Sequence, residues 1–317
     1  MSPRRGDVVR LFEYGTTLHE EARTVTDARG TFQFERSKTT PFMVSVLHQN
    51  VTYHSARFLI GGLVEVSVYD SLQLVDRVKE DGEALFVEAD TKSLKVAQFF
   101  IVSNLSDPPR TYVGASTFDF LLPNGATLDS VDAQPGGSLP SAMRPIKLAG
   151  NNHFGIRYPI RPGITKIVAT YHLPHASKVP IAARFLRPIG YFKVKLPASM
   201  QFASGMENAF VQEGEENGIV TRIARNVHLG SRLSFSVSGV GDIHALSAAA
   251  LKKARSSYPV ASTPASGLVP VNAQISAQGH KLGANAAGKI IKFAIMLFLV
   301  LIALRVWRKP DRLHKTS

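Results

Sequence analysis

The chain has 317 residues, a formal net charge of +13 and no cysteine. This length is sufficient for two β-domains with hydrophobic cores, and the lack of cysteine excludes disulfides, thiolate zinc sites and a cysteine nucleophile. The charge is local: residues 243–317 carry 11 Lys and Arg against 1 acidic residue, whereas residues 63–242 carry 18 against 17. Because the part predicted to fold lacks a basic face, no nucleic-acid partner is predicted.

Residues 1–62 show the alternation of apolar and polar positions that is typical of a small β-domain. Phe32 and Phe34 fall on one face of a short segment that follows Asp27-Ala28-Arg29-Gly30. That tetrapeptide predicts a tight turn, since Asp at its first position accepts backbone hydrogen bonds and Gly at its last tolerates positive φ. The predicted strands are 8–12, 22–26, 31–35, 42–46 and 51–53.

One pattern in this segment is specific enough to indicate a family. It is formed by Val9, Leu11, Thr24, Thr26, Asp27, Gly30, Phe32, Phe34, Val44 and Val46. With these residues, the stretch 7–56 resembles a carboxypeptidase regulatory-like domain, which implies a transthyretin-like β-sandwich.

The resemblance also implies a strand before residue 8, and the chain starts too late to contain it. Arg4 and Arg5 are not followed by the apolar stretch of a signal peptide. We therefore expect a bacterial membrane protein whose sequence is N-terminally incomplete, without its first strand and its export signal.

Residues 63–242 continue the alternation and predict a larger antiparallel β-sandwich. Residues 123–125 (Pro-Asn-Gly) and 161–163 (Arg-Pro-Gly) are turn tripeptides, and the second closes a hairpin. The order TF.F.LP.GA followed by Y.I.PG.T resembles a region found beside regulatory-like domains in bacterial envelope proteins, a likeness that implies no known activity. The predicted fold class is all-β, with two Ig-like or transthyretin-like sandwich domains.

The last part of the chain changes in composition. Residues 243–288 are rich in Ala, Ser, Gly and Pro without apolar periodicity, and predict a disordered stalk. Residues 289–307 predict one transmembrane helix, in which Lys292 and Arg305 snorkel and Trp307 lies at the interface. Residues 308–317 form a basic tail.

Lys and Arg are more numerous after the predicted helix than before it. The positive-inside rule then places the short C-terminal tail in the cytoplasm and the body beyond the inner (cytoplasmic) membrane. The alternative takes Met1 as the native start and gives a cytosolic, tail-anchored adaptor.

The regulatory-like domain is named after metallopeptidases, in which it accompanies a zinc catalytic domain. The chain contains neither H-E-x-x-H nor H-x-x-E, the arrangements that place ligands and a general base around zinc. No catalytic, cofactor-binding or metal-binding residue is predicted, and the chain is predicted not to be an enzyme.

Three polar groups were weighed as metal sites, and each is better interpreted as surface. His172 and His175 have an H-x-x-H spacing, but Pro174 bends the chain between them. His48 and His54 flank a hairpin turn and predict a cross-strand surface pair. Glu213, Glu215 and Glu216 predict an acidic, solvated loop that fits no EF-hand spacing.

Four aromatic residues, Tyr112, Phe118, Tyr158 and Tyr171, have two interpretations. They line a sugar- or protein-binding face, or they alternate into the core. The leading hypothesis is a non-enzymatic, single-pass envelope protein that is anchored in the bilayer by residues 289–307 and presents β-sandwiches to an envelope protein or carbohydrate. The alternative from another class is an enzyme, or an accessory subunit, of envelope peptide or polysaccharide processing.

Overall fold

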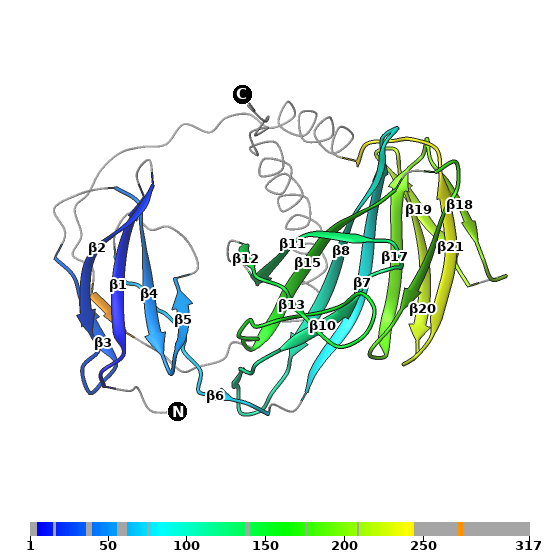
Figure 1. Ribbon diagram of the computed structural model, residues 1–317. Helices are drawn as coiled ribbons and strands as arrows, with labels where there is room; N and C mark the ends of the chain where they lie inside the picture. The colour runs from blue at the N-terminus through cyan, green and yellow to red at the C-terminus, as the bar shows by residue number, and fades with distance from the viewer. Residues whose placement is uncertain are drawn as a thin grey trace, which may run out of the picture.

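The computed structural model describes residues 5–14, 17–35, 40–55, 62–74, 77–136, 140–174, 176–207, 209–243 and 272–274. The elements described there are all β-strands, which confirms the predicted all-β class. They form a smaller first unit, residues 5–69, and a larger second unit, residues 70–243 (Figure 1).

The strands follow one another closely along the chain. They are β1 (Val8–Tyr14), β2 (Leu18–Val25), β3 (Thr31–Gln33), β4 (Phe42–His48), β5 (Val51–His54), β6 (Ser71–Leu72), β7 (Val78–Ala89), β8 (Ser93–Asn104), β9 (Thr111–Tyr112), β10 (Phe118–Leu121), β11 (Thr127–Pro135), β12 (Ser141–Met143), β13 (Ile146–Lys147), β14 (His153–Ile156), β15 (Gly163–Pro174), β16 (Val179–Arg184), β17 (Ile189–Pro197), β18 (Gln201–Ser204), β19 (Val211–Glu216), β20 (Ile219–Val227), β21 (Arg232–Ser238) and β22 (Asn272–Gln274).

The first unit is built on an antiparallel sheet in the order β2-β1-β4-β5. Alternate residues of its strands point into one hydrophobic core, which contains Leu11 and Val44. The same core includes Val64 and Val66, so the first unit continues past the boundary predicted at residue 62. Burial of the Val64 and Val66 side chains in this core is favourable because it removes apolar surface from water.

The tight turn predicted at Asp27–Gly30 is confirmed. Asp27 Oδ1 accepts hydrogen bonds from the backbone N–H groups of Arg29 and Thr31, both at 2.8 Å. Gly30 has a φ of +72°, a conformation that costs glycine little. The turn therefore delivers Phe32 and Phe34 into the core, where their rings meet edge to face.

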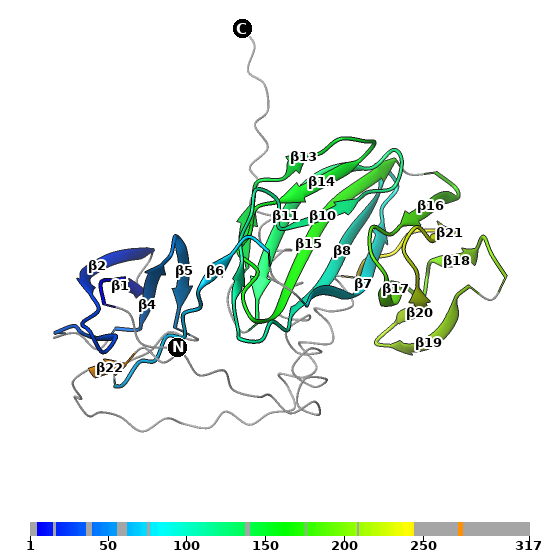
Figure 2. The same ribbon diagram turned by 90° about the horizontal axis from the view of Figure 1, so that it is seen from below.

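The second unit has two layers. One layer is an eight-stranded sheet in the order β12-β11-β15-β8-β7-β17-β20-β19. Two three-stranded sheets, β10-β14-β13 and β16-β21-β18, face different parts of it, as Figure 2 shows. One continuous hydrophobic core lies between the layers, with aromatic contacts such as Phe100 to Phe118 at 5.2 Å. This arrangement supports the predicted larger β-sandwich.

The predicted disordered stalk is wrong at one place. Residues 272–274 form β22, which pairs with β3 of the first unit. The pairing gives the β3 edge a backbone partner, which an exposed strand otherwise lacks. The rest of the stalk after residue 243, the predicted transmembrane helix 289–307 and the basic tail 308–317 lie outside the described residues. Among the described residues, no helix has the length and apolar character needed to cross a bilayer.

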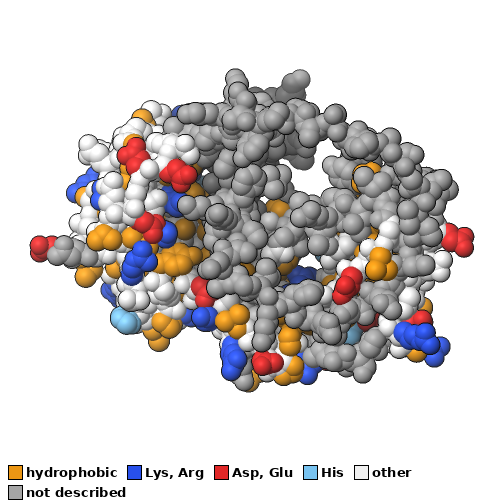
Figure 3. Space-filling model, turned by 180° about the vertical axis from the view of Figure 1, so that it is seen from behind, with side chains coloured by type: hydrophobic (Ala, Val, Ile, Leu, Met, Phe, Trp, Pro, Cys, Tyr) orange, Lys and Arg blue, Asp and Glu red, His pale blue; other side chains and the backbone are white. Residues whose placement is uncertain are grey.

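Charged side chains of both signs are interspersed on the described surface. Figure 3 shows Lys and Arg next to Asp and Glu on both units, without a field of one sign. Ion pairs of the described residues include Arg23 with Glu20 at 2.9 Å and Lys193 with Glu213 at 2.6 Å. Exposed pairs of this kind contribute little to stability.

Gly82→Ala is expected to destabilise the second unit. A Cβ at Gly82 would lie 2.4 Å from Cζ of Tyr191, whose strand β17 pairs in parallel with β7. Relieving that overlap requires either ring or sheet to shift, at a cost of about 1–3 kcal/mol. Urea denaturation measures the loss. Gly214→Ala in β19 is the control, because nothing lies within 4 Å of a Cβ there. Equal stabilities of the two variants would contradict the expectation.

Candidate functional site

Arg161 connects the two units. Its Nη1 donates a hydrogen bond to Tyr158 Oη at 2.9 Å, and its Nη2 donates to the backbone carbonyl of Thr52 in the first unit. The guanidinium also lies 5.3 Å from the ring centre of Tyr53 and 5.5 Å from that of Tyr158. A planar cation stacked between two tyrosines and bonded to both units fixes their contact.

A second polar connection is built around His48. Its Nδ1 lies 2.9 Å from the carboxylate of Asp7, and its Nε2 lies 3.4 Å from Asp70 Oδ1. Asp70 is also bonded to Arg110 of the second unit. The predicted surface pair of His48 and His54 is therefore wrong, because His48 is buried and is paired in register with Val51 instead.

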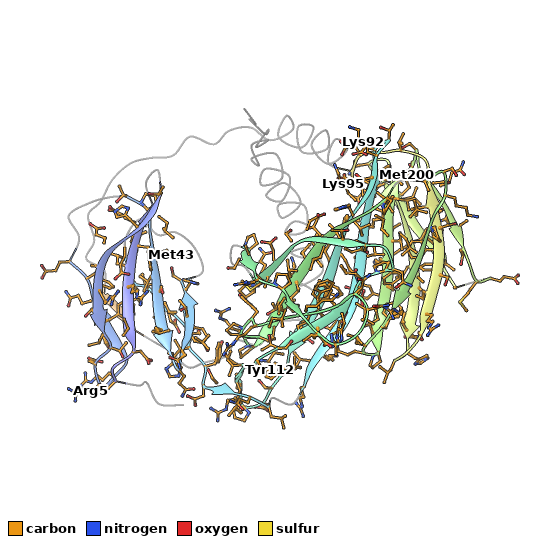
Figure 4. All side chains as sticks on the ribbon, in the orientation of Figure 1. Arg5, Met43, Lys92, Lys95, Tyr112 and Met200 are labelled. Carbon is orange, nitrogen blue, oxygen red and sulfur yellow. The ribbon has the colours of Figure 1, made fainter. Side chains whose placement is uncertain are left out.

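A hollow of about 780 Å³ lies where the two units meet. Tyr112, which Figure 4 places between the units, forms part of its wall. The polar side chains that line it are Gln49, Asn50, Gln73, Tyr112, Ser116, Thr117, Arg157 and Tyr158. Burial raises the pKa of Tyr158, so its hydroxyl stays a neutral hydrogen-bonding group.

A second pocket, of about 480 Å³, opens at the end of the sandwich beside β7 and β10. Val78, Phe118 and Leu148 give it apolar walls. Tyr112, Ser116 and Thr117 line both this pocket and the hollow between the units. The charged residues that line this pocket are Lys79, Glu80, Asp119 and Arg187.

Arg187 holds two carboxylates at this pocket. Its Nε donates to Glu80 Oε2 at 3.1 Å and its Nη1 donates to Asp119 Oδ1 at 2.7 Å. Its Nη2 donates to the backbone carbonyl of Asp119. His153 Nε2 lies 2.8 Å from the other oxygen of Asp119. The eight-stranded sheet, the β10-β14-β13 sheet and the segment before β17 are thus joined at one guanidinium.

Glu83 lies deeper, inside the core. Gln98 Nε2 donates a hydrogen bond to Glu83 Oε2 at 2.7 Å. Burial, and then the neighbouring charge of Glu80, raise the pKa of Glu83 well above its usual range. A protonated Glu83 donates a hydrogen bond to Glu80, whose own pKa is raised by burial. The two glutamates therefore behave as one coupled acid pair.

Tyr171 completes the buried polar group. It is fully buried, and burial raises the pKa of its hydroxyl, with a further contribution from the Glu83 carboxyl. Its Oη has no hydrogen-bond partner among the described residues. Of the four aromatic residues considered in the sequence, Tyr171 belongs to the core. Tyr112, Phe118 and Tyr158 line pockets, and Phe118 and Tyr158 are mostly buried as well.

The other residues weighed as metal ligands are dispersed. His172 Nδ1 lies 2.9 Å from Asp129 Oδ1, and His175 lies outside the described residues. The predicted acidic loop is wrong in its structure, because Glu213, Glu215 and Glu216 belong to strand β19 and are exposed. Within the described part of the chain, no group of three or more His, Asp or Glu side chains is placed to hold a metal ion.

Sequence reasoning missed Glu80, Glu83 and Arg187. In a regular strand, residues three apart point to opposite faces, so alternation places only one of the two glutamates inside. A bulge between Glu80 and Gly82 inserts one residue and turns both toward the core, opposite Val102 and Phe100. The one signal for it in the sequence is a glycine inside a strand pattern.

Comparisons with known proteins add a distant likeness. No protein-family model matches the chain, and no curated protein sequence matches it. Among solved structures, an M1 zinc metallopeptidase from Deinococcus radiodurans is 14% identical with a TM-score of 0.30, and a mutant of it bound to a Tyr-Ser-Ala substrate is 15% identical with the same score. Each match covers 52% of this chain and 43% of the peptidase, less than half its length. No functional argument rests on this likeness.

Glu83→Gln is expected to flatten the fall in stability with rising pH. Above the usual carboxyl pKa of about 4.3, the unfolded chain releases this proton while the folded chain keeps it, so folding becomes less favourable as pH rises. Glutamine carries no such proton and still accepts from Gln98. The variant should match the wild type near that pH and exceed its stability increasingly toward neutral pH.

The measurement is urea denaturation across that pH range, with Glu215→Gln in the exposed strand β19 as the matched control. Parallel pH profiles for the wild type and Glu83→Gln would show that the buried carboxyl is ionised in the folded protein.

Proposed function

We propose that the chain is a non-enzymatic, single-pass envelope protein that binds carbohydrate in the hollow between its two β-units. The observation that carries this proposal is the lining of that hollow of about 780 Å³. It combines the amide groups of Asn50 and Gln73 with tyrosine rings and an exposed arginine, Arg157.

This lining suits a sugar better than a purely apolar ligand. Each sugar hydroxyl both donates and accepts a hydrogen bond, and an amide side chain offers both functions. Tyr112 adds aromatic surface for the C–H face of a sugar ring and a polar hydroxyl at its edge. Ligand sites are commonly found between domains, with few polar groups that set orientation.

The contact between the units supports a preformed site. Tyr53 Oη donates to the backbone carbonyl of Tyr69 at 2.8 Å and lies 2.7 Å from Thr111 Oγ1 in the second unit. With Arg161 bonded to both units, the walls of the hollow keep their separation. Less ordering on binding leaves more of the interaction energy as affinity.

The membrane part of the proposal rests on the sequence. Residues 293–304 form an uncharged apolar run within the segment 289–307, and basic residues flank it. We propose that this segment anchors the chain in the inner membrane, with the β-units outside the cytoplasm and residues 308–317 inside.

A processing enzyme, or its accessory subunit, is the second candidate. The observation that favours it is the coupled pair of Glu80 and Glu83 beside a pocket, because carboxyls with raised pKa values supply general acids. The sequence contains no zinc-peptidase motif. Hydrolysis of a bound glycan by the purified chain would favour this candidate.

Binding is tested with the purified full-length chain in detergent on an array of bacterial glycans. Arg157→Ala is expected to lower the affinity for the captured glycan about tenfold, which is the loss expected for one polar contact. Arg144→Ala is the matched control, because Arg144 is exposed and does not line the hollow. Absence of any glycan signal, or equal losses of affinity in the two variants, would contradict carbohydrate binding.

Topology is tested by protease treatment of intact spheroplasts, with detection by an antibody against residues 63–242. Digestion of the β-units without lysis is expected, because the more basic C-terminal flank should stay in the cytoplasm. A variant with Arg308, Lys309, Arg312 and Lys315 changed to Gln serves as the orientation control and should be digested less. Full protection of the wild type until lysis would favour the cytosolic adaptor.

A further inference from the structure

The pocket of about 480 Å³ at the end of the sandwich is distinct in chemistry from the hollow between the units. We propose that it binds a small organic cation, a primary ammonium group carried on an apolar body. The proposal is independent of carbohydrate binding, although both cavities share the Tyr112 wall.

The carboxylates at this pocket outnumber the guanidinium that pairs with them. Glu80 and Asp119 share the single guanidinium of Arg187. Lys79, the other cation in the lining, pairs with Asp81 at 3.3 Å. Two carboxylates therefore depend on one guanidinium, and Glu83 adds a third carboxyl behind them.

Arg187 is not available to bind an anionic ligand. Its Nε, Nη1 and Nη2 all donate to Glu80 or Asp119, so its hydrogen bonds are directed at groups of the protein itself. Its face is covered by the ring of Phe118, with 4.5 Å between the guanidinium carbon and the ring centre. A carboxylate or phosphate ligand would meet acidic groups before it met this cation.

Oε1 of Glu80 is the atom that no N–H or hydroxyl donor of the described residues reaches, whereas Oε2 accepts from Arg187. Glu80 is 7% exposed and lines the pocket. The neighbouring Glu83 carboxyl donates to it only while it holds a proton. An ammonium ligand brings three N–H donors and a positive charge, and so replaces that proton.

The remaining walls of the pocket favour an apolar group on the ligand beside its ammonium group. Val78, Val102, Phe118 and Leu148 supply apolar surface around the carboxylates. A pocket of this volume holds a ligand with one ring, whose burial contributes affinity through the hydrophobic effect. The expected ligand class is therefore a small amphipathic amine.

The test uses the full-length chain and benzylamine as the probe, with benzyl alcohol as the neutral molecule of similar shape. Isothermal titration near about pH 8 should show at least tenfold tighter binding of the amine, because only the amine carries a charge. Repeating the titration in buffers of different ionisation enthalpy should show proton release, since the ligand takes the place of the Glu83 proton.

Three variants separate this site from a general acidic surface. Glu80→Gln should weaken benzylamine about tenfold or more, whereas Glu215→Gln on exposed strand β19 should leave its affinity unchanged. Glu83→Gln should bind without releasing a proton. His153→Gln should still release it, which assigns the proton to the glutamate pair instead of the other titratable side chain on Asp119.

The wild-type measurements alone can overturn the proposal if Glu80→Gln fails to fold. Equal binding of amine and alcohol, or binding of neither at millimolar concentration, contradicts a cation site. Equal weakening in Glu80→Gln and Glu215→Gln shows attraction to acidic surface only. A glycan signal that persists when benzylamine fails to bind leaves the proposed carbohydrate function standing and rejects this site.

Discussion

The bulge between Glu80 and Gly82 in β7 is the constraint around which the second unit is arranged. β7 lies between β8 and β17 near the middle of the eight-stranded sheet, so a change in its register would reach both halves of the sandwich. The extra residue turns Glu80 and Glu83 into the core, and Gly82 leaves room for the Tyr191 ring on the parallel strand. Two buried carboxyls then require partners: Arg187, from the segment before β17, pairs with Glu80, and Gln98 donates to Glu83. The bulge therefore links the fold to the chemistry of the pocket.

The junction between the units is held by polar groups and by a smaller apolar contact. Val113 of the second unit packs against the core of the first, while Arg161 and the network of Asp7, His48 and Asp70 supply directed bonds. Apolar contact alone permits sliding, because the hydrophobic effect has no direction. Hydrogen bonds to a buried histidine and a stacked arginine fix one orientation. The hollow between the units is thus defined by the same contacts that hold the units together.

The sequence predicts the parts of the fold that depend on local chemistry. Alternation indicates the all-β class, and Asp27 with Gly30 indicates the first turn, because both follow from strand geometry and backbone preferences.

Features that depend on the register of strand pairing were predicted wrongly or missed. His48 and His54 are not opposite each other, since β4 and β5 pair His48 with Val51, and the acidic run at Glu213 continues a strand instead of forming a loop. The pair of Glu80 and Glu83 was missed because one bulged residue reverses the face that alternation assigns. The pairing of residues 272–274 with β3 was missed because contacts between distant segments leave no local pattern.

The two cavities share a wall formed by Tyr112, Ser116 and Thr117. The Tyr112 side chain lines both, but its backbone is fixed on two sides: Leu72 pairs with it in the short parallel sheet, and its N–H and C=O exchange hydrogen bonds of 2.9 Å with Ile160. A ligand in one cavity influences the other only if it binds two arrangements of the shared wall with different affinity. The backbone of Tyr112, which is held on both sides, has little freedom to adopt a second arrangement. The geometry therefore favours independent filling of the two proposed sites, the one for carbohydrate hydroxyl groups and the one for an organic cation.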